Sequence, residues 1–326
     1  MSRGAWGPLL RSGVLGAALA LAPHAAAQPY PAKPIKVLVP FAPGGTADII
    51  ARIVSARLVD ELGQQFLIEN RSGAGGTIAT AMVAKAPADG YTLLFIHQGL
   101  AFNAALYASL PYDTLRDLRP IAMVGATPNV LVVNPSVPVG TVQEFLALAR
   151  ARPGALAYGS GGIGSAGHLA VELLESLAGV TLTHVPYKGS GPALTDLVAG
   201  QIQTMIVTMP AVVSYVKGGK VRAIATSGAR RSPAMPQLPT IAESGVPGYE
   251  YTPWYGWFGP GALPEAIAER LHGAIDNVLA APAMRDQLGR QGIEVEIMLS
   301  ARFAEIVRAD VARWGKIIRD AGIRAE

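Results

Sequence analysis

Two glycine-rich stretches carry the residue types that could bind an anion. The first, Phe41-Ala-Pro-Gly-Gly-Thr-Ala-Asp48, lies between an apolar run and a helical pattern. The second, Tyr158-Gly-Ser-Gly-Gly-Ile-Gly-Ser-Ala-Gly-His168, lies in the same kind of context. A turn that leads into a helix exposes backbone N–H groups with partial positive charge, which favour an anion. These residues therefore indicate recognition of an anionic group by backbone amides.

Neither stretch has the residues of a nucleotide site. No Lys follows Gly44 and Gly45, so the first stretch is not a Walker A loop. The second stretch matches Gly-x-Gly-x-x-Gly twice, from Gly159 and from Gly162, which reflects its glycine density. The acidic residue that a dinucleotide site needs about 20 residues later is missing. We therefore expect the two turns to hold one anionic ligand between them.

Several side chains near these turns have both a structural and a ligand-binding interpretation. Asp48 lies in the first turn of a helix, where a carboxylate favours the macrodipole, but it could also orient a ligand amine or a water. His168 begins a helix, and we favour a structural role over ligand contact. Lys188 could attract an acid or be a solvated surface residue. We interpret the aromatic cluster of residues 254–258 as packing between domains rather than as a ligand cage.

The sequence lacks the residue patterns of common enzymes. It contains no Cys and no Gly-x-Ser-x-Gly, and its five His residues have no metal-ligand spacing with Asp or Glu. Paired carboxylates for acid–base work are not evident either. We expect no catalytic residue, no metal and no cofactor, and we keep an exported hydrolase as the enzyme alternative.

The N-terminus has the pattern of a targeting segment. Arg3 and Arg11 form a positive segment before a short apolar run, residues 14–22, and Ala25-Ala-Ala27 supplies a small-x-small cleavage signal. We expect residues 1–27 to be a signal peptide, with an uncleaved anchor as the alternative. A chain of this length without Cys fits a bacterial periplasm. The net charge of +4 comes without a basic run, so we expect no nucleic-acid partner.

Hydrophobic patterns predict an α/β protein with two lobes. The first half alternates β-rich runs with helical patterns, which indicates a parallel sheet flanked by helices. The alternation restarts near residue 121. The expected strands are 35–39, 66–69, 92–96, 121–124, 129–133, 156–158, 181–185, 204–208 and 221–225. The expected helices are 47–62, 77–86, 141–150, 165–177, 193–198, 264–280, 283–290 and 300–320.

The C-terminal helices come with too little strand to form a third domain. We therefore expect them to cover the first sheet, with chain crossings near 125–130 and 250–256. Lobe 1 would comprise residues 28–128 and 254–326, and lobe 2 residues 129–253. Two lobes joined by two crossings bracket a cleft suited to a small ligand.

Taken together and in order, the turns resemble a known family. The sequence is similar to the Bug family of bacterial extracytoplasmic solute receptors, the substrate-binding proteins of tripartite tricarboxylate transporters. The resemblance covers essentially the whole chain after residue 27. It is carried by PAKPIKVLVPFAPGGTAD, NRSGAGGTIATAMVAKAPADGYTLL, LYASLPYD, LAYGSGGIGSAGHLAVELL, HVPYKGSGPALTDLVAGQI and LPTIAESGVPGYE.

The resemblance implies a type II periplasmic-binding-protein fold, with two lobes that close on a ligand. It also implies small carboxylate ligands, which include dicarboxylates, amino acids and aromatic acids, held largely by backbone amides and waters. The implied ligand-binding residues are Phe41, Ala42, Gly44, Gly45, Thr46 and Asp48 in lobe 1, and Ser160, Gly162, Gly164, Ser165, His168, Tyr187 and Lys188 in lobe 2.

We add His97, Gln98 and Thr208 to the candidate ligand-binding residues. The segment 96–100 replaces a small, Ser/Gly-rich stretch of many relatives, and we expect it to face the distal end of the ligand. Its bulk departs from the family pattern and weighs against the family's typical ligands. We expect a monomer that delivers a carboxylate to membrane transporter subunits. The alternative is a sensor that presents its closed form to a membrane kinase.

Overall fold

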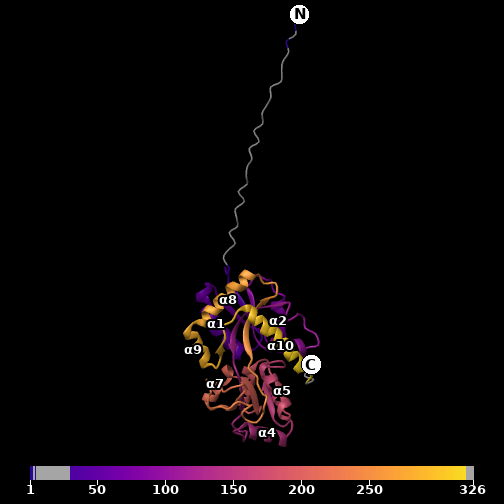
Figure 1. Cartoon of the computed structure of the whole chain (residues 1–326), viewed down its shortest axis with the longest axis vertical. Helices are drawn as coiled ribbons and strands as arrows, with labels where there is room; N and C mark the ends of the chain where they lie inside the picture. Colours follow the sequence, from indigo (N-terminus) through magenta and orange to yellow (C-terminus); the bar gives the residue numbers. More distant parts are fainter. Residues whose placement is uncertain (3, 5–29, 321–326) are drawn as a thin grey trace.

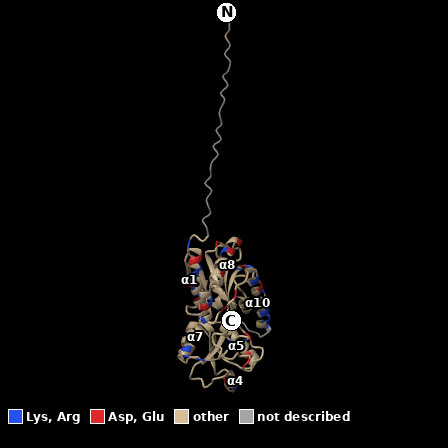
Figure 2. Cartoon of the chain, turned by 60° about the vertical axis from the view of Figure 1, so that its left-hand side comes forward, with Lys and Arg blue, Asp and Glu red and all other residues tan. Residues whose placement is uncertain are grey.

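The computed structural model describes residues 1–2, 4 and 30–320, and shows two α/β lobes stacked one on the other (Figure 1). The expected signal peptide, residues 1–27, lies almost entirely outside the described residues. Among the helices that are described, none is both long and apolar enough to cross a membrane. Charged residues of both signs occur along outer helices such as those labelled α1, α8 and α10 (Figure 2).

The first lobe is built on a sheet with the strand order β11-β4-β10-β3-β1-β2. β1 pairs in parallel with β2 and β3, whereas β10 runs antiparallel between β3 and β4. The strands are β1 (Ile35–Val39), β2 (Phe66–Asn70), β3 (Thr92–His97), β4 (Leu118–Ala126), β10 (Trp254–Pro260) and β11 (Glu294–Val295). The helices are α1 (Thr46–Leu62), η1 (Ala74–Gly76), α2 (Thr77–Ala84), α3 (Gly99–Leu106), α8 (Glu265–Ala280), α9 (Pro282–Arg290) and α10 (Ser300–Asp320).

The second lobe has the strand order β7-β6-β8-β5-β9. β5 runs antiparallel to both of its neighbours, and the other strands share one direction. The strands are β5 (Asn129–Val133), β6 (Ala157–Ser160), β7 (Thr183–Pro186), β8 (Thr204–Thr208) and β9 (Arg222–Thr226). The helices are α4 (Val142–Ala151), α5 (Ala166–Ala178), α6 (Ser190–Val198) and α7 (Met209–Lys217). Thr141 and Glu144 form the capping box of α4, as their spacing predicts.

The chain crosses between the sheets at two neighbouring places. β4 ends at Ala126 and β5 begins at Asn129, so the first crossing is only two residues long. The second crossing leads into Trp254 at the start of β10. The Thr127 N–H donates to the Pro253 carbonyl at 3.2 Å, which ties the two crossings together. Hinges between lobes are formed by a few residues at the ends of such elements.

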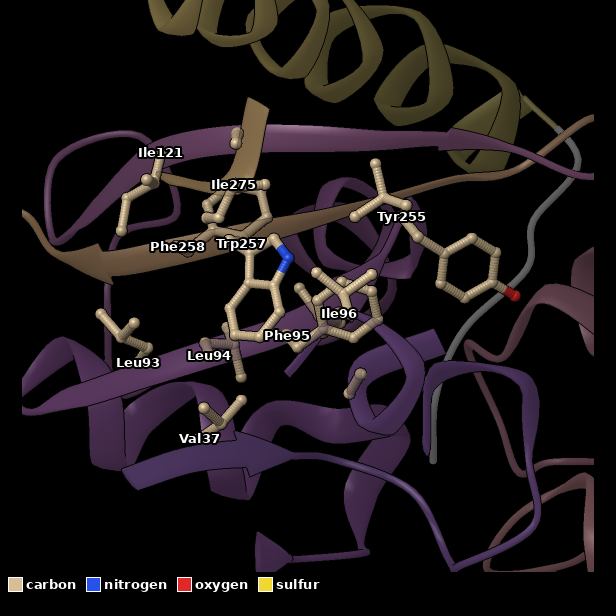
Figure 3. Packing of buried hydrophobic residues seen from close by; sticks show 14 of the residues in the cluster. Val37, Leu93, Leu94, Phe95, Ile96, Ile121, Tyr255, Trp257, Phe258 and Ile275 are labelled. Carbon is tan, nitrogen blue, oxygen red and sulfur yellow. The ribbon is translucent and has the colours of Figure 1, made fainter. Parts of the chain in front are cut away.

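The lobe 1 core surrounds an aromatic group on β3 and β10. Trp257 and Phe95 are fully buried, with ring centroids 5.0 Å apart. Figure 3 shows Trp257 among aliphatic side chains such as Val37, while the Tyr255 hydroxyl points out of this cluster. Trp257 and Phe258 therefore belong to the lobe 1 core, and the predicted role of residues 254–258 in packing between domains does not apply to them.

The C-terminal helix α10 contacts both lobes. Phe303 packs on Trp254 at the crossing, with ring centroids 5.1 Å apart. Further along the helix, Trp314 packs on Phe102 of α3 at 4.7 Å and on Tyr251 at 5.6 Å. These last residues belong to a buried cluster that also contains lobe 2 side chains. Part of the α10 surface therefore helps to define the relative position of the lobes, beyond the expected covering of the first sheet.

Five elements were not expected from the sequence: the short η1 and β11, and the longer α3, α7 and β10. α3 occupies residues interpreted as part of a loop, because its short apolar pattern is buried on nearly all sides. α7 directly follows β8, with Pro210 in its first turn. β10 has every residue buried, so it lacks the alternation that marks a half-exposed strand.

Candidate functional site

A cavity with about 440 Å³ of empty space, counted together with space open to solvent, lies between the two sheets, at the ends of β1, β3, β6 and β8. Both lobes contribute to its wall. The lining residues are Phe41, Gly45, Thr46, Ala47, His97, Ser160, Gly161, Ser165, Ala166, Gly167, Ser190, Met205, Ile206, Val207, Thr208 and Tyr255.

Four helices begin at this cavity. Gly45 and Thr46 start α1, and Ser165 is the N-cap of α5. Ser190 is the first residue of α6, and Thr208 is the N-cap of α7. The first-turn N–H groups of a helix have no acceptor within the helix, and the helix dipole places partial positive charge there. One helix comes from lobe 1 and three from lobe 2, so an anion here is attracted by both lobes.

Hydroxyl groups add donors and acceptors to these amides. The Oγ1 atoms of Thr46 and Thr208 lie within hydrogen-bond distance across the cleft. The Tyr255 hydroxyl interacts with both of these threonines. Ser160 Oγ lies 2.6 Å from His184 Nε2 and accepts from the Gly162 N–H at 3.1 Å. The cavity therefore offers hydrogen-bonding groups but no charged wall, since no Asp, Glu, Lys or Arg is among its lining residues.

His97 is the one lining residue that titrates near neutral pH in water. Its side chain is buried, and burial lowers its pKa from 6.5 to about 3. Its Nδ1 accepts a hydrogen bond from the Gly99 N–H at 2.8 Å. Its ring stacks on Phe41, with centroids 4.8 Å apart and an interplanar angle of 18°. His97 is therefore a neutral imidazole at physiological pH.

Asp48 lies beneath the first turn and not in the cavity wall. Its carboxylate accepts from the Gly44 N–H at 3.0 Å, from Arg52 Nε at 2.9 Å and from Asn70 Nδ2 at 3.0 Å. Burial raises the pKa of Asp48, but these hydrogen bonds outweigh burial and hold the pKa below its usual value. Asn70 also donates to the Phe41 carbonyl at 2.9 Å. Asp48 thus fixes the shape of the Pro-Gly-Gly turn.

His168 supports the second turn in a similar way. Its Nδ1 accepts from the Gly164 N–H at 3.3 Å, and its ring stacks on His184 at 4.5 Å. Burial, with a smaller contribution from His184, lowers the pKa of His168 to about 3. Its Nε2 lies 3.5 Å from Glu172, whose pKa is raised by burial. This geometry agrees with the structural interpretation that we favoured for His168.

A second cavity adjoins the first and shares Phe41 and Gly161 with it. It brings together three further candidate residues, Gly162, Tyr187 and Lys188. Beside it, the Ala42 N–H donates to the Lys188 carbonyl at 3.1 Å. The turn of lobe 1 thus contacts the strand–helix junction of lobe 2 directly, so the cleft is closed.

The candidate residues divide into three groups. Phe41, Gly45, Thr46, His97, Ser160, Ser165 and Thr208 line the cavity, and Gly162, Tyr187 and Lys188 line its neighbour. The remainder lie in or under the turns, except Gln98. Its Nε2 donates to Asp310 of α10 at 2.7 Å, so its side chain is committed away from the cavity.

Sequence reasoning missed two important lining side chains. Ser190 opens α6 within the quoted motif HVPYKGSGPALTDLVAGQI, and a strand followed by a glycine-flanked helix start was the available signal. Tyr255 lies on β10, and no signal for that strand was recognised. Its register opposite His97 on β3 brings the Tyr255 ring to the cavity, 5.8 Å from the His97 ring.

The family model described as "Tripartite tricarboxylate transporter family receptor" matches residues 50–323. The chain belongs to this receptor family. Protein BugT of Bordetella pertussis is 37% identical over 314 residues, which cover 96% of each chain. A protein encoded in the tcbD–tcbE intergenic region of Pseudomonas sp. strain P51 is 38% identical, with 91% of this chain and 88% of that protein covered.

Solved receptors share the same architecture. R. palustris Rpa4515, solved with adipate, superimposes with a TM-score of 0.88 at 39% identity, over 90% of this chain and 99% of that one. MatC from Rhodopseudomonas palustris, solved with bound malate, gives a TM-score of 0.85 at 33% identity, over 89% of this chain and 100% of that one. The predicted two-lobed α/β fold and the family resemblance are therefore confirmed.

Proposed function

We propose that this receptor binds a small organic acid in the cavity between its lobes and holds the carboxylate with the N-termini of α1, α5, α6 and α7. The observation that carries the proposal is the meeting of these four helix starts in a cavity without a charged side chain. Two relatives of the same architecture are described with the dicarboxylates adipate and malate bound.

The energetics of such a site fit a transport receptor. Hydrogen bonds between backbone amides and a carboxylate are charge-assisted, each worth about 1.5–3 kcal/mol. Several of these, less the cost of immobilising a small ligand, give a dissociation constant of the order of micromolar. A neutral, preformed site therefore supports binding that is selective and still reversible.

Closure is coupled to binding because both lobes contribute to the site. We propose that lobe 1 comprises residues 28–128 and 254–326 and lobe 2 residues 129–253, so that the hinge coincides with the bonded crossings at Thr127 and Pro253. A ligand held by amides of both lobes stabilises the closed form over the open one. We further propose that residues 1–27 direct export to the periplasm, where the closed receptor delivers its acid to membrane transporter subunits.

A thermal-shift and calorimetric panel tests this function. Residues 28–326 are titrated with mono-, di-, tri- and aromatic carboxylates, amino acids, sugars and nucleotides. We expect at least one carboxylate to raise the melting temperature and to bind with micromolar affinity. Stabilisation by a sugar or nucleotide with no response to any acid would contradict the proposal.

A matched pair of variants locates the site. Thr46 and Thr77 are both buried threonines that begin a helix, but only Thr46 lines the cavity. We expect Thr46→Val to weaken binding of the best acid by roughly tenfold, as expected for loss of a hydrogen bond to a charged group. Thr77→Val should leave the affinity unchanged. Equal effects of the two substitutions would place the ligand elsewhere.

A further inference from the structure

His97 is the most constrained polar side chain of the cavity wall. It ends β3, and only 5% of its surface is exposed. Phe41 stacks on one face of the ring at 4.8 Å, and Tyr255 meets it edge-on at 5.8 Å. These rings leave the imidazole one orientation on the lobe 1 wall of the cleft, whereas three of the four helix starts belong to lobe 2.

The hydrogen bond from Gly99 fixes the tautomer of this ring. Because Nδ1 accepts from the Gly99 N–H, the proton of the neutral imidazole must be on Nε2. Nε2 has no hydrogen-bond partner among the described residues, and His97 lines the cavity. Nε2 is not among the fully buried unpaired atoms, so it is open to the cavity. A ligand that covers Nε2–H without an acceptor leaves the donor buried and unpaired, which costs free energy, whereas a ligand that supplies an acceptor avoids this cost.

We propose that His97 is the specificity-determining residue of the cleft, and that its Nε2–H donates to a second oxygen acceptor of the ligand, distinct from the carboxylate held by the helix starts. This inference rests on the proposed function and adds a ligand class to it. The class is an acid with a carboxylate, amide or other carbonyl oxygen at its far end. An alkyl acid of the same length would bury Nε2–H unpaired.

The predicted discrimination follows from that unpaired donor. Sites built to hydrogen-bond a polar group reject analogues that lack it much more strongly than they reject a change of one methylene. For one hydrogen bond to a charged acceptor, we expect a preference of roughly tenfold to a hundredfold. The neutral Nε2–H can also donate to an uncharged carbonyl oxygen. The cavity wall has no cation, so it does not require a second negative charge on the ligand.

The test compares acids that differ only at the far end. Each α,ω-dicarboxylate from succinate to suberate is titrated by calorimetry beside the monocarboxylate of equal chain length, and adipate is also compared with its monoamide. The proteins are wild type, His97→Phe and His97→Gln. His97→Phe keeps a ring against Phe41 but removes the donor, whereas His97→Gln keeps a donor without the ring. Circular dichroism and apo melting temperature establish that each variant is folded.

We expect wild type to prefer a dicarboxylate over its matched monocarboxylate, His97→Phe to lose most of that preference, and His97→Gln to retain part of it. Equal binding of adipate and its monoamide would identify the acceptor as a carbonyl oxygen, and preference for adipate would identify it as a second carboxylate. If the variants bind acids with the wild-type preference, His97 is not the specificity residue and the receptor function stands. If wild type binds none of these acids, nor any in the wider panel, the proposed function itself is overturned.

Discussion

Gly75 provides a direct test of whether the closed cleft is the ligand-bound form. It has a φ of +59°, and a Cβ at this position would lie 2.5 Å from the Ile163 carbonyl oxygen. Gly75 belongs to η1 of lobe 1, whereas Ile163 lies in the glycine-rich turn of lobe 2. The collision of Gly75→Ala therefore arises mainly across the cleft, and opening of the lobes relieves it.

The magnitude follows from two separate costs. An ordinary contact begins at 3.4 Å, so the two lobes would have to separate by up to 0.9 Å at this point. Overpacking of this kind costs about 1–3 kcal/mol, which corresponds to a loss of affinity of roughly fivefold to 150-fold. The left-handed backbone adds about 1–2 kcal/mol of strain to both the open and the closed forms, and so lowers stability without changing affinity.

Gly63→Ala is the matched control. Gly63 has a φ of +67° at the end of α1, and a Cβ there would meet no atom within 4 Å. Both substitutions should lower the apo melting temperature by a similar amount, but only Gly75→Ala should weaken binding of the best carboxylate. Calorimetry measures the affinity, and small-angle scattering with and without the acid measures closure. Wild-type affinity and closure in Gly75→Ala would refute the reasoning.

Three further predictions address the supports of the site. Asp48→Ala should lower the apo melting temperature at pH 7 more than it lowers affinity, and the difference from wild type should shrink as the pH falls through the depressed pKa of Asp48, because that carboxylate stabilises the fold only while ionised. By NMR, His97 should stay neutral from pH 8 to 5, because burial lowers its pKa to about 3. As the pH falls from 6.5 toward 3, the unfolded chain binds a proton at His97 that the folded protein excludes, so the folded protein should lose stability over this range. Trp314→Ala should destabilise the protein by about 3–5 kcal/mol in urea unfolding, since it removes a buried ring between α10 and α3, whereas an exposed substitution on the same helix such as Arg302→Ala should be nearly neutral. An unchanged apo melting temperature in Asp48→Ala would contradict the first prediction. An imidazole of His97 that titrates near pH 6.5 would contradict the second, and equal effects of Trp314→Ala and Arg302→Ala would contradict the third.

Local sequence determined most of the regular structure. Strands such as Ile35–Val39 and helices such as Ala166–Ala178 have a hydrophobic period that survives folding, because each buries a face against its neighbours. The capping pair Thr141 and Glu144 could be recognised because its hydrogen bonds span only three residues. Patterns of this range do not require knowledge of the tertiary fold.

The two glycine-rich turns were also visible in the sequence, because an apolar strand, a glycine turn and a helix pattern follow one another directly. This local order was enough to predict amides that face an anion, together with Thr46, Ser160 and Ser165, which line the cavity. It did not separate residues that face the cavity from those that shape the turn. Asp48 and Gln98 have the right position in sequence, but their hydrogen bonds direct them to Arg52 and to Asp310.

Only the tertiary structure decided which distant residues complete the cavity. β10 arrives from the far end of the chain, and its antiparallel register with β3 places Tyr255 opposite His97. Likewise, the neutral state and tautomer of His97 depend on burial and on the Gly99 N–H. The order of residues along the chain does not reveal that β10 pairs with β3, because this pairing within the first sheet joins segments more than 150 residues apart.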